Sequence, residues 1–379
     1  MSGLYLHIPF CKHKCLYCDF YTGGSRIADW QLYAKCLINE LKLRKDEISE
    51  KYETLYFGGG TPSLIPTETF KYLTEGLKKV LSQKNWDEFT IEVNPEDVTK
   101  ENTRQWKKSG VDRISIGIQT LNDSELISIG RRHESITAEN VLKYLIKEFG
   151  NISIDLMFGL PNQTLESYNK TLDKILKIKP PHISSYALML EEGTALTLLE
   201  KQGKIKLPKE EEWIQMSDLT TKRLLENGYN RYEISNFSLE GYESKHNSSY
   251  WEGMPYLGLG PGAHSYDGKR LRRANPNNIK GYLKFFDDIP SKRNNSNFFI
   301  EEILTDEELR EEMILTRMRT TNGLKLEEYK TNFGEQQKET LLKKAEKFIK
   351  SGYLKEGNDK LIFTNKGFQI SDTILTSLI

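Results

Sequence analysis

Three of the four cysteines in this chain lie within eight positions near its N-terminus, in the stretch HIPFCKHKCLYCDF. Their spacing is C-x3-C-x2-C, and they are Cys11, Cys15 and Cys18. Because the thiolate is the metal-binding form of cysteine, three thiols on one short loop can converge on a metal centre. One candidate is a structural zinc site, in which His7 or His13 would supply the fourth ligand. The other is a [4Fe–4S] cluster with one iron left without a protein ligand, where a small molecule could coordinate.

The sequence around this loop alternates between short apolar runs and amphipathic stretches. The runs predicted to be strands are residues 4–8, 54–59, 89–93, 113–118, 152–158 and 182–188. Helical patterns stand between them, as in DWQLYAKCLINELKLRKDEI and TPSLIPTETFKYLTEGLKKVL. Such repetition predicts a parallel sheet with its helices outside, and about six units fit a full or partial β/α barrel. Polar and glycine-rich segments (GGGTP, EVNPE, GIQT and DLMFGLP) follow several strands, at the end where barrels carry their chemistry.

Three regions are predicted along the chain. Residues 1–235 form the barrel core, and residues 236–300 form a connecting segment that is rich in Gly, Asn, Ser and aromatic residues and expected to be mostly loop. Residues 301–379 form a smaller C-terminal domain, which opens with a capping box made by Thr305 and Glu308. A helix, a hairpin and a further helix follow, an order that suits either a winged-helix-like domain or a plain α/β cap. The predicted fold class is therefore α/β, a partial (β/α)6-type barrel with a smaller C-terminal α/β domain.

The composition limits the cellular location and the classes of partner that we expect for the protein. Acidic and basic residues balance at 54 each in 379 residues, so no global charge favours nucleic acid or an anionic membrane. No apolar run is long enough to span a bilayer, and the first residues lack the pattern of a secretory signal. Four cysteines are too few for a disulfide scaffold, so we expect a cytoplasmic protein with reduced thiols. The fourth, Cys36, falls on an amphipathic stretch and is expected to be a small buried residue.

The cysteine spacing after a first strand resembles that of the radical S-adenosylmethionine (SAM) superfamily. The resemblance implies a radical SAM barrel, in which the three cysteines hold a [4Fe–4S] cluster and SAM chelates the open iron through its amino and carboxylate groups. In that superfamily the reduced cluster passes an electron to the sulfonium, which yields a 5′-deoxyadenosyl radical and methionine. The motifs YLHIPFC, YFGGGTPS, IEVNPE, SIGIQTLND, GRRH and IDLMFGLPNQT narrow the likeness to the family of oxygen-independent coproporphyrinogen III oxidase and its HemW-like relatives. The likeness runs from residue 4 nearly to the end of the chain.

The same resemblance assigns a SAM site along the strands and the loops that follow them. Its residues are Tyr5, Tyr17, Gly59, Gly60, Thr61, Glu92, Gln119, Arg131 and Asp155. The glycines follow a strand and would let the backbone approach a ligand with no Cβ in the way. Without the resemblance, the other members would be read as surface, capping or core residues.

Two features separate this chain from the oxidase branch of the family. The oxidase motif carries a further cysteine two positions after the third, where this chain has Phe20. The oxidase also has several tens of residues before its cluster, whereas here the cluster motif begins at residue 11. Both features are typical of HemW-like proteins, which are regarded as haem chaperones.

The segment after the core contains a candidate haem site. HNSSYW resembles a motif associated with haem in HemW-like proteins, and the candidate haem-binding residues are His246, Asn247, Tyr250 and Trp251. A neutral imidazole can ligate haem iron, and Tyr and Trp offer flat apolar faces to a porphyrin. The basic run KRLRR over residues 269–273 could meet haem propionates or could be a solvated loop. His264, in GPGAHSY, is a rival ligand, although the oxidases share that motif.

The leading hypothesis is a haem chaperone of the HemW-like type. The implied cofactors are a [4Fe–4S] cluster, SAM and haem, and the implied partners are haem and haem-accepting proteins, of the respiratory chain by family resemblance. No nucleic-acid partner and no transmembrane segment are expected, while transient membrane association and a homodimer stay open. The alternative is the oxidase reaction, the radical SAM decarboxylation of coproporphyrinogen III to protoporphyrinogen IX. A third hypothesis is a radical SAM enzyme with an unrelated substrate, so the sequence leaves open whether the protein is an enzyme.

Overall fold

Six parallel strands form the centre of the molecule, as the sequence predicts. The structure is a computed structural model that describes residues 1–22, 29–48, 51–288 and 298–379. The central strands are β1 Gly3–Ile8, β2 Thr54–Gly59, β3 Glu88–Val93, β4 Arg113–Gln119, β5 Asn151–Phe158 and β6 His182–Ala187. They lie side by side in chain order, each parallel to the next. The sheet that they belong to has two free edges, so the predicted partial barrel is confirmed.

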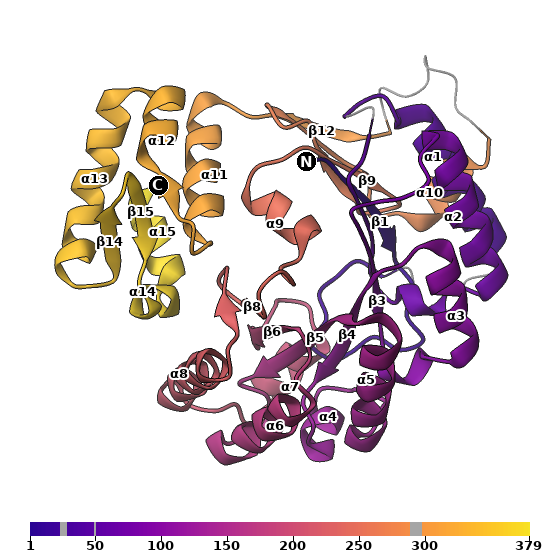
Figure 1. The fold of residues 1–379 in the computed structure, drawn as a ribbon, viewed down its shortest axis with the longest axis horizontal. Helices are drawn as coiled ribbons and strands as arrows, with labels where there is room; N and C mark the ends of the chain where they lie inside the picture. Colours follow the sequence, from indigo (N-terminus) through magenta and orange to yellow (C-terminus); the bar gives the residue numbers. More distant parts are fainter. Residues whose placement is uncertain (23–28, 49–50, 289–297) are drawn as a thin grey trace.

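Helices follow these strands, and the longer ones cover the outer, convex face of the sheet (Figure 1). They are α1 Trp30–Arg44, α2 Thr67–Leu81, α3 Lys100–Ser109, α4 Asp123–Ser128, α5 Ser135–Phe149, α6 Leu165–Ile178, α7 Ala195–Lys201 and α8 Glu210–Glu226. Side chains alternate across a strand, and β1 illustrates the result. Leu4, Leu6 and Ile8 belong to the apolar core between sheet and helices. Tyr5 and His7 therefore point to the inner, concave face, where the candidate site lies.

The segment 236–300 is more regular than predicted, and it extends the sheet on both sides. Its strands and their neighbours are β7 Asn230–Arg231, β8 Asn236–Ser238, β9 Tyr256–Leu259, β10 His264–Tyr266, β11 Leu271–Ala274 and β12 Ile300–Ile303, and its helices are α9 Lys245–Trp251 and α10 Ile279–Phe286. β8 pairs with β6, β9 pairs parallel with β1, and β10, β11 and β12 continue outward from β9. The expectation that this segment is mostly loop was therefore too strong, whereas its role as a connecting and haem-binding segment stays a prediction. Strands of two to four residues are too short to show a period in the sequence, which is why they were missed.

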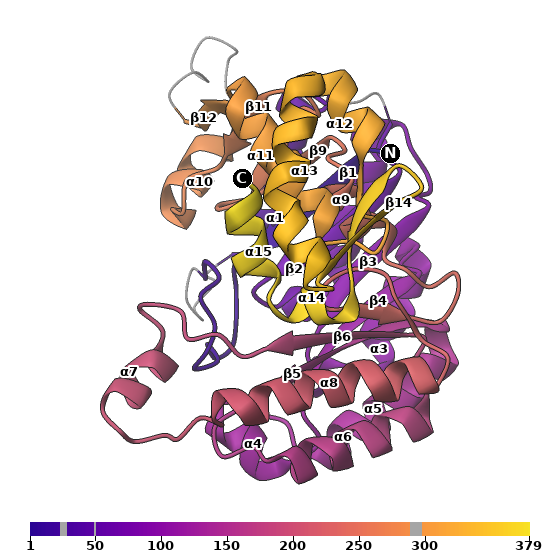
Figure 2. The same cartoon turned by 90° about the vertical axis from the view of Figure 1, so that its left-hand side faces the viewer.

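The C-terminal domain has its own hydrophobic core and a small sheet of order β13-β15-β14. Its elements are α11 Asp306–Met318, β13 Leu324–Lys325, α12 Leu326–Phe333, α13 Glu335–Lys350, β14 Leu354–Gly357, β15 Lys360–Phe363, α14 Asn365–Gln369 and α15 Ser371–Leu378. Helix, strand, two helices and a hairpin is the order of a winged helix, and two short helices follow it. The capping box of Thr305 and Glu308 is present at the start of α11. Figure 2 shows this domain as a separate layer on the concave side of the large sheet.

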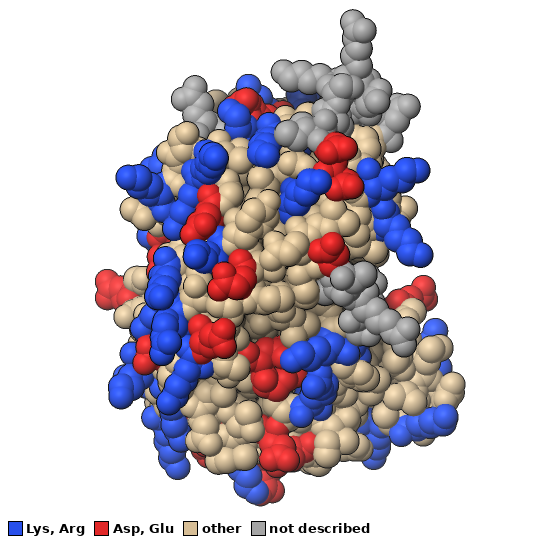
Figure 3. All heavy atoms as spheres, turned by 90° about the vertical axis from the view of Figure 1, so that its right-hand side faces the viewer, with Lys and Arg blue, Asp and Glu red and all other residues tan. Residues whose placement is uncertain are grey.

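Basic and acidic side chains both occur on the surface that the outer helices form. Figure 3 shows Lys and Arg side chains interspersed with Asp and Glu on this face. This agrees with the zero formal net charge of the sequence. Among the described residues, no helix has the length and apolar character that crossing a bilayer requires.

Candidate functional site

The cysteine loop leaves the carboxyl end of β1 and is held against the ends of neighbouring strands. The Gly60 N–H donates to the Ile8 carbonyl at 2.9 Å, so the chain after β2 stays paired with β1 up to the loop. Farther along, the Leu16 N–H donates to the Ile129 carbonyl at 3.1 Å, and the Leu196 N–H donates to the Leu16 carbonyl at 2.8 Å. These backbone bonds fix the loop at the carboxyl end of the parallel strands, where barrel proteins place their reactive groups.

Polar groups from neighbouring segments reach two of the three thiols. The Thr61 hydroxyl donates to the Cys11 sulfur at 3.3 Å, and the Arg131 guanidinium donates to the Cys15 sulfur at 3.5 Å. Burial raises the pKa of Cys11 and of Cys18, which disfavours their thiolates as long as no metal is bound. The positive charge of Arg131 acts in the opposite direction and favours the anionic sulfur that a metal requires.

The donor set fits an iron–sulfur cluster better than a zinc ion. In the described ranges, no three His, Cys, Asp or Glu side chains are gathered as a single metal ion requires. Tetrahedral zinc needs four donors around one point, whereas a [4Fe–4S] cluster gives each thiolate its own iron. His7, one of the two candidate fourth zinc ligands, has both ring nitrogens in internal hydrogen bonds, to the Tyr5 hydroxyl at 3.0 Å and to the Tyr21 carbonyl at 3.1 Å.

The glycine turn after β2 is shaped by close contacts with the start of the cysteine loop. Gly59 has φ +110°, and a Cβ at this position would lie 2.6 Å from the His7 ring. A Cβ at Gly60 would lie 2.9 Å from the Ile8 carbonyl oxygen and 2.9 Å from the backbone of Phe10. Only a residue without a side chain lets the cysteine loop pass so closely over the end of β2.

Glu92 is the centre of a hydrogen-bonded set on the inner face of the sheet. It accepts from the Gly59 N–H at 3.0 Å and from the Tyr56 hydroxyl at 2.8 Å. Burial raises the pKa of Glu92 to about 7, and the Asp155 carboxylate adds to this shift while the two hydrogen bonds oppose it. Burial also raises the pKa of Asp155 to about 6. The Tyr5 ring stacks on Tyr56 with the centroids 6.0 Å apart. Four of the predicted SAM residues therefore lie around Glu92 and Tyr56, namely Tyr5, Gly59, Asp155 and Glu92 itself.

The remaining predicted SAM residues lie near the same end of the barrel. Gln119 has φ +68°, which is uncommon outside glycine, at a bulge where the register of β4 on β5 shifts. Arg131 donates to the Gly117 carbonyl from one nitrogen and to the Cys15 sulfur from another. Its buried Nε has no hydrogen-bond partner among the described residues, so this donor is open to an anionic ligand group. Tyr17 lies on the cysteine loop, and burial raises its pKa.

Three residues near the site were not singled out from the sequence. Tyr56 lies directly opposite Tyr5 in the register of β2 on β1, and Asn94 donates to the Thr61 hydroxyl at 3.3 Å. Glu96 is 3.4 Å from the His133 ring, and although burial acts to raise its pKa, His133 and other nearby groups lower it to about 2. Asn94 and Glu96 belong to the EVNPE segment, whose position after a strand was the available signal.

Replacing Glu92 with glutamine should change how the stability of the protein depends on pH. The folded protein keeps the Glu92 proton up to about pH 7, whereas the unfolded chain releases it near 4.5. The wild-type protein therefore loses stability as the pH rises between these values, because the unfolded state releases the proton first. Glutamine has no proton to release, so the free energy of unfolding of the variant should gain roughly 1–3 kcal/mol on the wild type across this window.

Urea unfolding of the cofactor-free proteins at intervals from about pH 4.5 to 8 measures this difference. The same substitution at Glu101, which is exposed on α3, is the control and should give no such trend. A stability difference between Glu92→Gln and wild type that stays constant with pH would contradict the assignment.

The predicted haem residues lie on α9, at the opposite end of the barrel from the cysteines. The Glu88 carboxylate accepts from the backbone N–H groups of Lys245 and His246, at 2.9 and 3.0 Å, and so fixes the first turn of α9. His246 is fully buried, and its ring nitrogens bond to the Thr54 hydroxyl at 2.7 Å and the Tyr250 hydroxyl at 2.8 Å. Thr54 is the first of the six residues of β2, and Gly59, in the glycine turn, is the last. At about 3.3 Å per residue, roughly 17 Å of strand separates the two ends.

The structure does not present His246 to a ligand in this conformation. Both ring nitrogens are used inside the protein, and burial lowers the pKa of His246 to about 3, so the ring is neutral. Asn247 lines an interior cavity together with Glu92 and Asp155, and Trp251 is half-buried at the end of the helix. The four residues are brought together on one helix, but a bond from His246 to haem iron requires that α9 move. Their haem-binding role stays a prediction.

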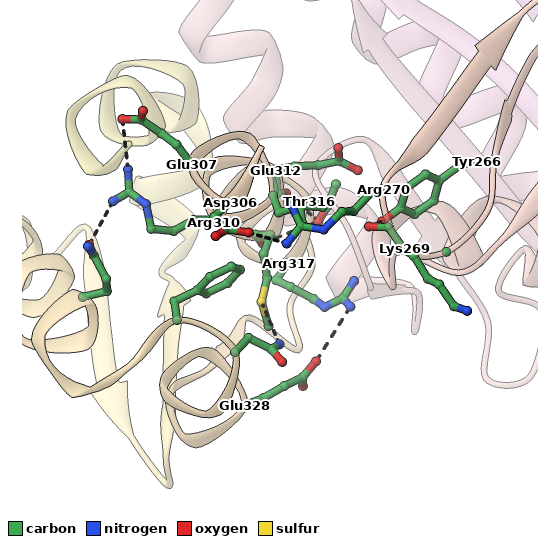
Figure 4. A pocket seen from close by; sticks show the side chains of 17 residues that line it. Tyr266, Lys269, Arg270, Asp306, Glu307, Arg310, Glu312, Thr316, Arg317 and Glu328 are labelled. Atoms are coloured by element: carbon green, nitrogen blue, oxygen red, sulfur yellow. Dashed lines mark hydrogen bonds and ion pairs between the residues drawn. The ribbon is translucent and has the colours of Figure 1, made fainter. Parts of the chain in front are cut away.

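The basic run 269–273 forms ion pairs within the protein. The pairs are Arg270 with Asp306, Arg272 with Glu312 and Arg273 with Glu301. Figure 4 shows Lys269 and Arg270 at the edge of a pocket that α11 and α12 line on the other side. Basic and acidic side chains are equally numerous around this pocket, four of each, so it has no excess of positive charge for propionates.

Two family models match the chain. Residues 5–175 match the Radical SAM superfamily, and residues 304–370 match the HemN C-terminal domain. Among solved structures, coproporphyrinogen III oxidase (HemN) from Escherichia coli, described as a radical SAM enzyme, superposes with a TM-score of 0.83. The match covers 100% of this chain and 89% of that chain at 22% sequence identity, which shows a shared fold and no more. The partial barrel with its cysteine loop is thus a radical SAM fold, and the superfamily implies SAM and a [4Fe–4S] cluster.

Curated relatives match the chain along most of its length. A Lactococcus lactis protein named heme chaperone HemW is 34% identical over 380 residues, which cover 100% of this chain and 97% of the relative. The Bacillus subtilis protein of the same name is 35% identical over 342 residues, or 88% of this chain and 87% of the relative. The chain therefore belongs to the HemW family.

Proposed function

We propose that this protein is a haem chaperone, which takes up haem and passes it to acceptor proteins. The observation that carries the proposal is the likeness to proteins named heme chaperone HemW, which extends over the barrel and the C-terminal domain alike. Phe20, where the oxidase branch has a further cysteine, supports the same assignment. The proposal includes acceptors of the respiratory chain, a cytoplasmic setting and a chain that forms a homodimer when loaded with its cluster.

In the proposed site, Cys11, Cys15 and Cys18 each hold one iron of the cluster. When bound, the cluster and SAM supply one-electron chemistry at the sulfonium. The protein's own groups prepare this site: Arg131 balances the charge of the thiolates, and the glycine turn leaves room beside the loop. Glu92 is an acceptor for the polar groups of SAM.

The raised pKa of Glu92 makes its acceptor role depend on pH. The carboxyl is largely protonated below about pH 7 and ionised above it. An ionised Glu92 accepts stronger hydrogen bonds, so SAM affinity should rise with pH through this window.

The test of the proposed function is a titration of the reconstituted protein. The full chain is loaded anaerobically with iron and sulfide, and haem is added while the haem absorbance is followed. The same preparation is incubated with coproporphyrinogen III, SAM and a reductant, and the porphyrin products are separated. We expect uptake of haem, transfer of haem to an apo-haemoprotein, and no protoporphyrin.

Each of the other results would assign a different function to the protein. Formation of protoporphyrin would assign the oxidase reaction, and the chaperone proposal would be abandoned. Substrate-dependent formation of 5′-deoxyadenosine from a cell extract, without any porphyrin, would point to a radical SAM enzyme with another substrate. Failure to take up haem at all would also remove the proposal.

A further inference from the structure

The histidines of this chain differ sharply in their access to solvent. There are six, and all lie within the described residues. Four of them are buried: His7, His133, His182 and His246. The two that remain exposed are His13 and His264. Because iron coordination needs a free ring nitrogen, only an exposed imidazole can receive haem without a rearrangement of the core.

Three of the four buried imidazoles have both ring nitrogens in hydrogen bonds. Each ring nitrogen of His7 and of His246 has a hydrogen-bond partner, as described above. The His182 ring bonds to the Ser153 hydroxyl and the Tyr232 hydroxyl, both at 2.7 Å. The His133 ring nitrogens have no hydrogen-bond partner among the described residues, but the ring is buried, with Nδ1 3.4 Å from the Glu96 carboxylate. Any of these four histidines could coordinate haem iron only if its buried ring became exposed.

We propose that His264, on the inner face of β10, is the residue that ligates haem iron. This inference rests on the proposed function and names the ligand for it. Neither ring nitrogen of His264 has a hydrogen-bond partner among the described residues, and the side chain is exposed. His13 is also exposed, but it lies between two of the cysteines and lines the small cavity beside Cys15, which the cluster and SAM would occupy.

Aromatic and cationic side chains share the face of β10 on which His264 lies. Side chains alternate along β10, and the Ser265 hydroxyl accepts from Arg44 on the helix side of the sheet, so His264 and Tyr266 share the other face. On that face the Arg272 guanidinium lies 4.7 Å from the Tyr266 ring centroid. The aromatic contacts continue into the neighbouring strand, where Tyr256 on β9 lies 6.5 Å from the buried Tyr266, centroid to centroid.

These aromatic contacts extend to α9, which carries the HNSSYW motif. The Tyr250 ring of α9 meets Tyr256 edge to face, with centroids 4.7 Å apart. The HNSSYW segment and His264 therefore belong to one face of the sheet, on which α9 supplies aromatic contacts and β10 supplies the accessible imidazole. Partial burial and the nearby Arg272 lower the pKa of His264, which keeps its ring neutral and able to coordinate at neutral pH.

The test compares haem binding by the cluster-loaded wild type with that of His264→Gly and His246→Gln. Haem affinity of His264→Gly should fall by at least about tenfold, the penalty typical of disturbed metal sites. Added imidazole should restore the wild-type absorption spectrum, because it can fill the space that the side chain leaves. A second variant, His264→Met, keeps a ligand but should change the spectrum.

The possible results distinguish a wrong assignment of the haem ligand from a wrong proposed function. If the wild type binds haem and His264→Gly keeps the same affinity and spectrum, His264 is not the ligand. If His246→Gln is the only variant that loses the absorption spectrum of imidazole-bound haem, His246 is the ligand. In that case α9 must move to expose the His246 ring. If the wild type takes up no haem, the chaperone proposal fails and this inference fails with it. Cluster content of His264→Gly should match the wild type, and urea unfolding should show only the small loss of stability that glycine causes in a strand, because the exposed ring has no hydrogen bond to lose.

Discussion

Replacing Cys15 with serine is expected to leave the protein colourless after anaerobic reconstitution, with iron and sulfide near background. Serine is close in size to cysteine, so the loop can keep its backbone bonds to Ile129 and Leu196. Its hydroxyl, however, stays protonated at neutral pH and is a poor ligand for an iron of the cluster, which is held by thiolates. With one of only three protein ligands lost, we expect near-complete loss of the cluster and not a partial reduction.

The matched control is the cysteine that the proposed site does not use. Cys36 on α1 is fully buried, and its thiol contacts the Leu283 carbonyl at 3.7 Å. Cys36→Ala should cost about 1 kcal/mol of stability through the small cavity that it leaves, while the cluster content stays at the wild-type level. Iron and sulfide analysis with visible absorbance distinguishes the two variants. A brown Cys15→Ser protein with full iron content would remove Cys15 from the ligand set.

The barrel core and the position of the cysteine loop could be predicted because both follow from short-range patterns. Each of the six strands is an apolar run of six to eight residues followed by an amphipathic helix, and the structure has a strand at each predicted place. Parallel strands joined in this way bring their carboxyl ends to one edge of the sheet. The family resemblance assigned Gly59, Glu92 and Gln119, far apart in the sequence, to one site, and this shared edge is the physical reason why they lie near one another.

The placement of the HNSSYW helix could not be predicted because it depends on long-range contacts. His246 bonds to Thr54, which is 192 residues away, and its N–H bonds to Glu88, which is 158 residues away. No local period encodes such pairs, and the motif alone indicates only which side chains could meet haem. The family resemblance therefore favoured His246 as a ligand, whereas in the structure this ring is part of the barrel interior and His264 is one of two exposed imidazoles.

Replacing Gly60 with alanine is expected to destabilise the fold and to reduce cluster occupancy together. A Cβ at this position would lie 2.9 Å from the Ile8 carbonyl oxygen and from two backbone atoms of Phe10, the residue next to Cys11. Backbone cannot move aside as a flexible side chain can, so the added methyl group must push the cysteine loop away from β2. Such overpacking costs typically about 1–3 kcal/mol, and the displacement acts directly on the geometry that the three thiols need.

The control for Gly60→Ala is Gly357→Ala, on β14 in the C-terminal domain. A Cβ there would meet no atom of the described residues within 4 Å, so neither stability nor iron content should fall. Urea unfolding of the cofactor-free variants measures the steric cost, and iron content after reconstitution measures the effect on the site. A Gly60→Ala protein that is destabilised but keeps full iron content would show that the cluster tolerates displacement of the loop. In that case the close passage of the loop over β2 serves folding and not cluster binding.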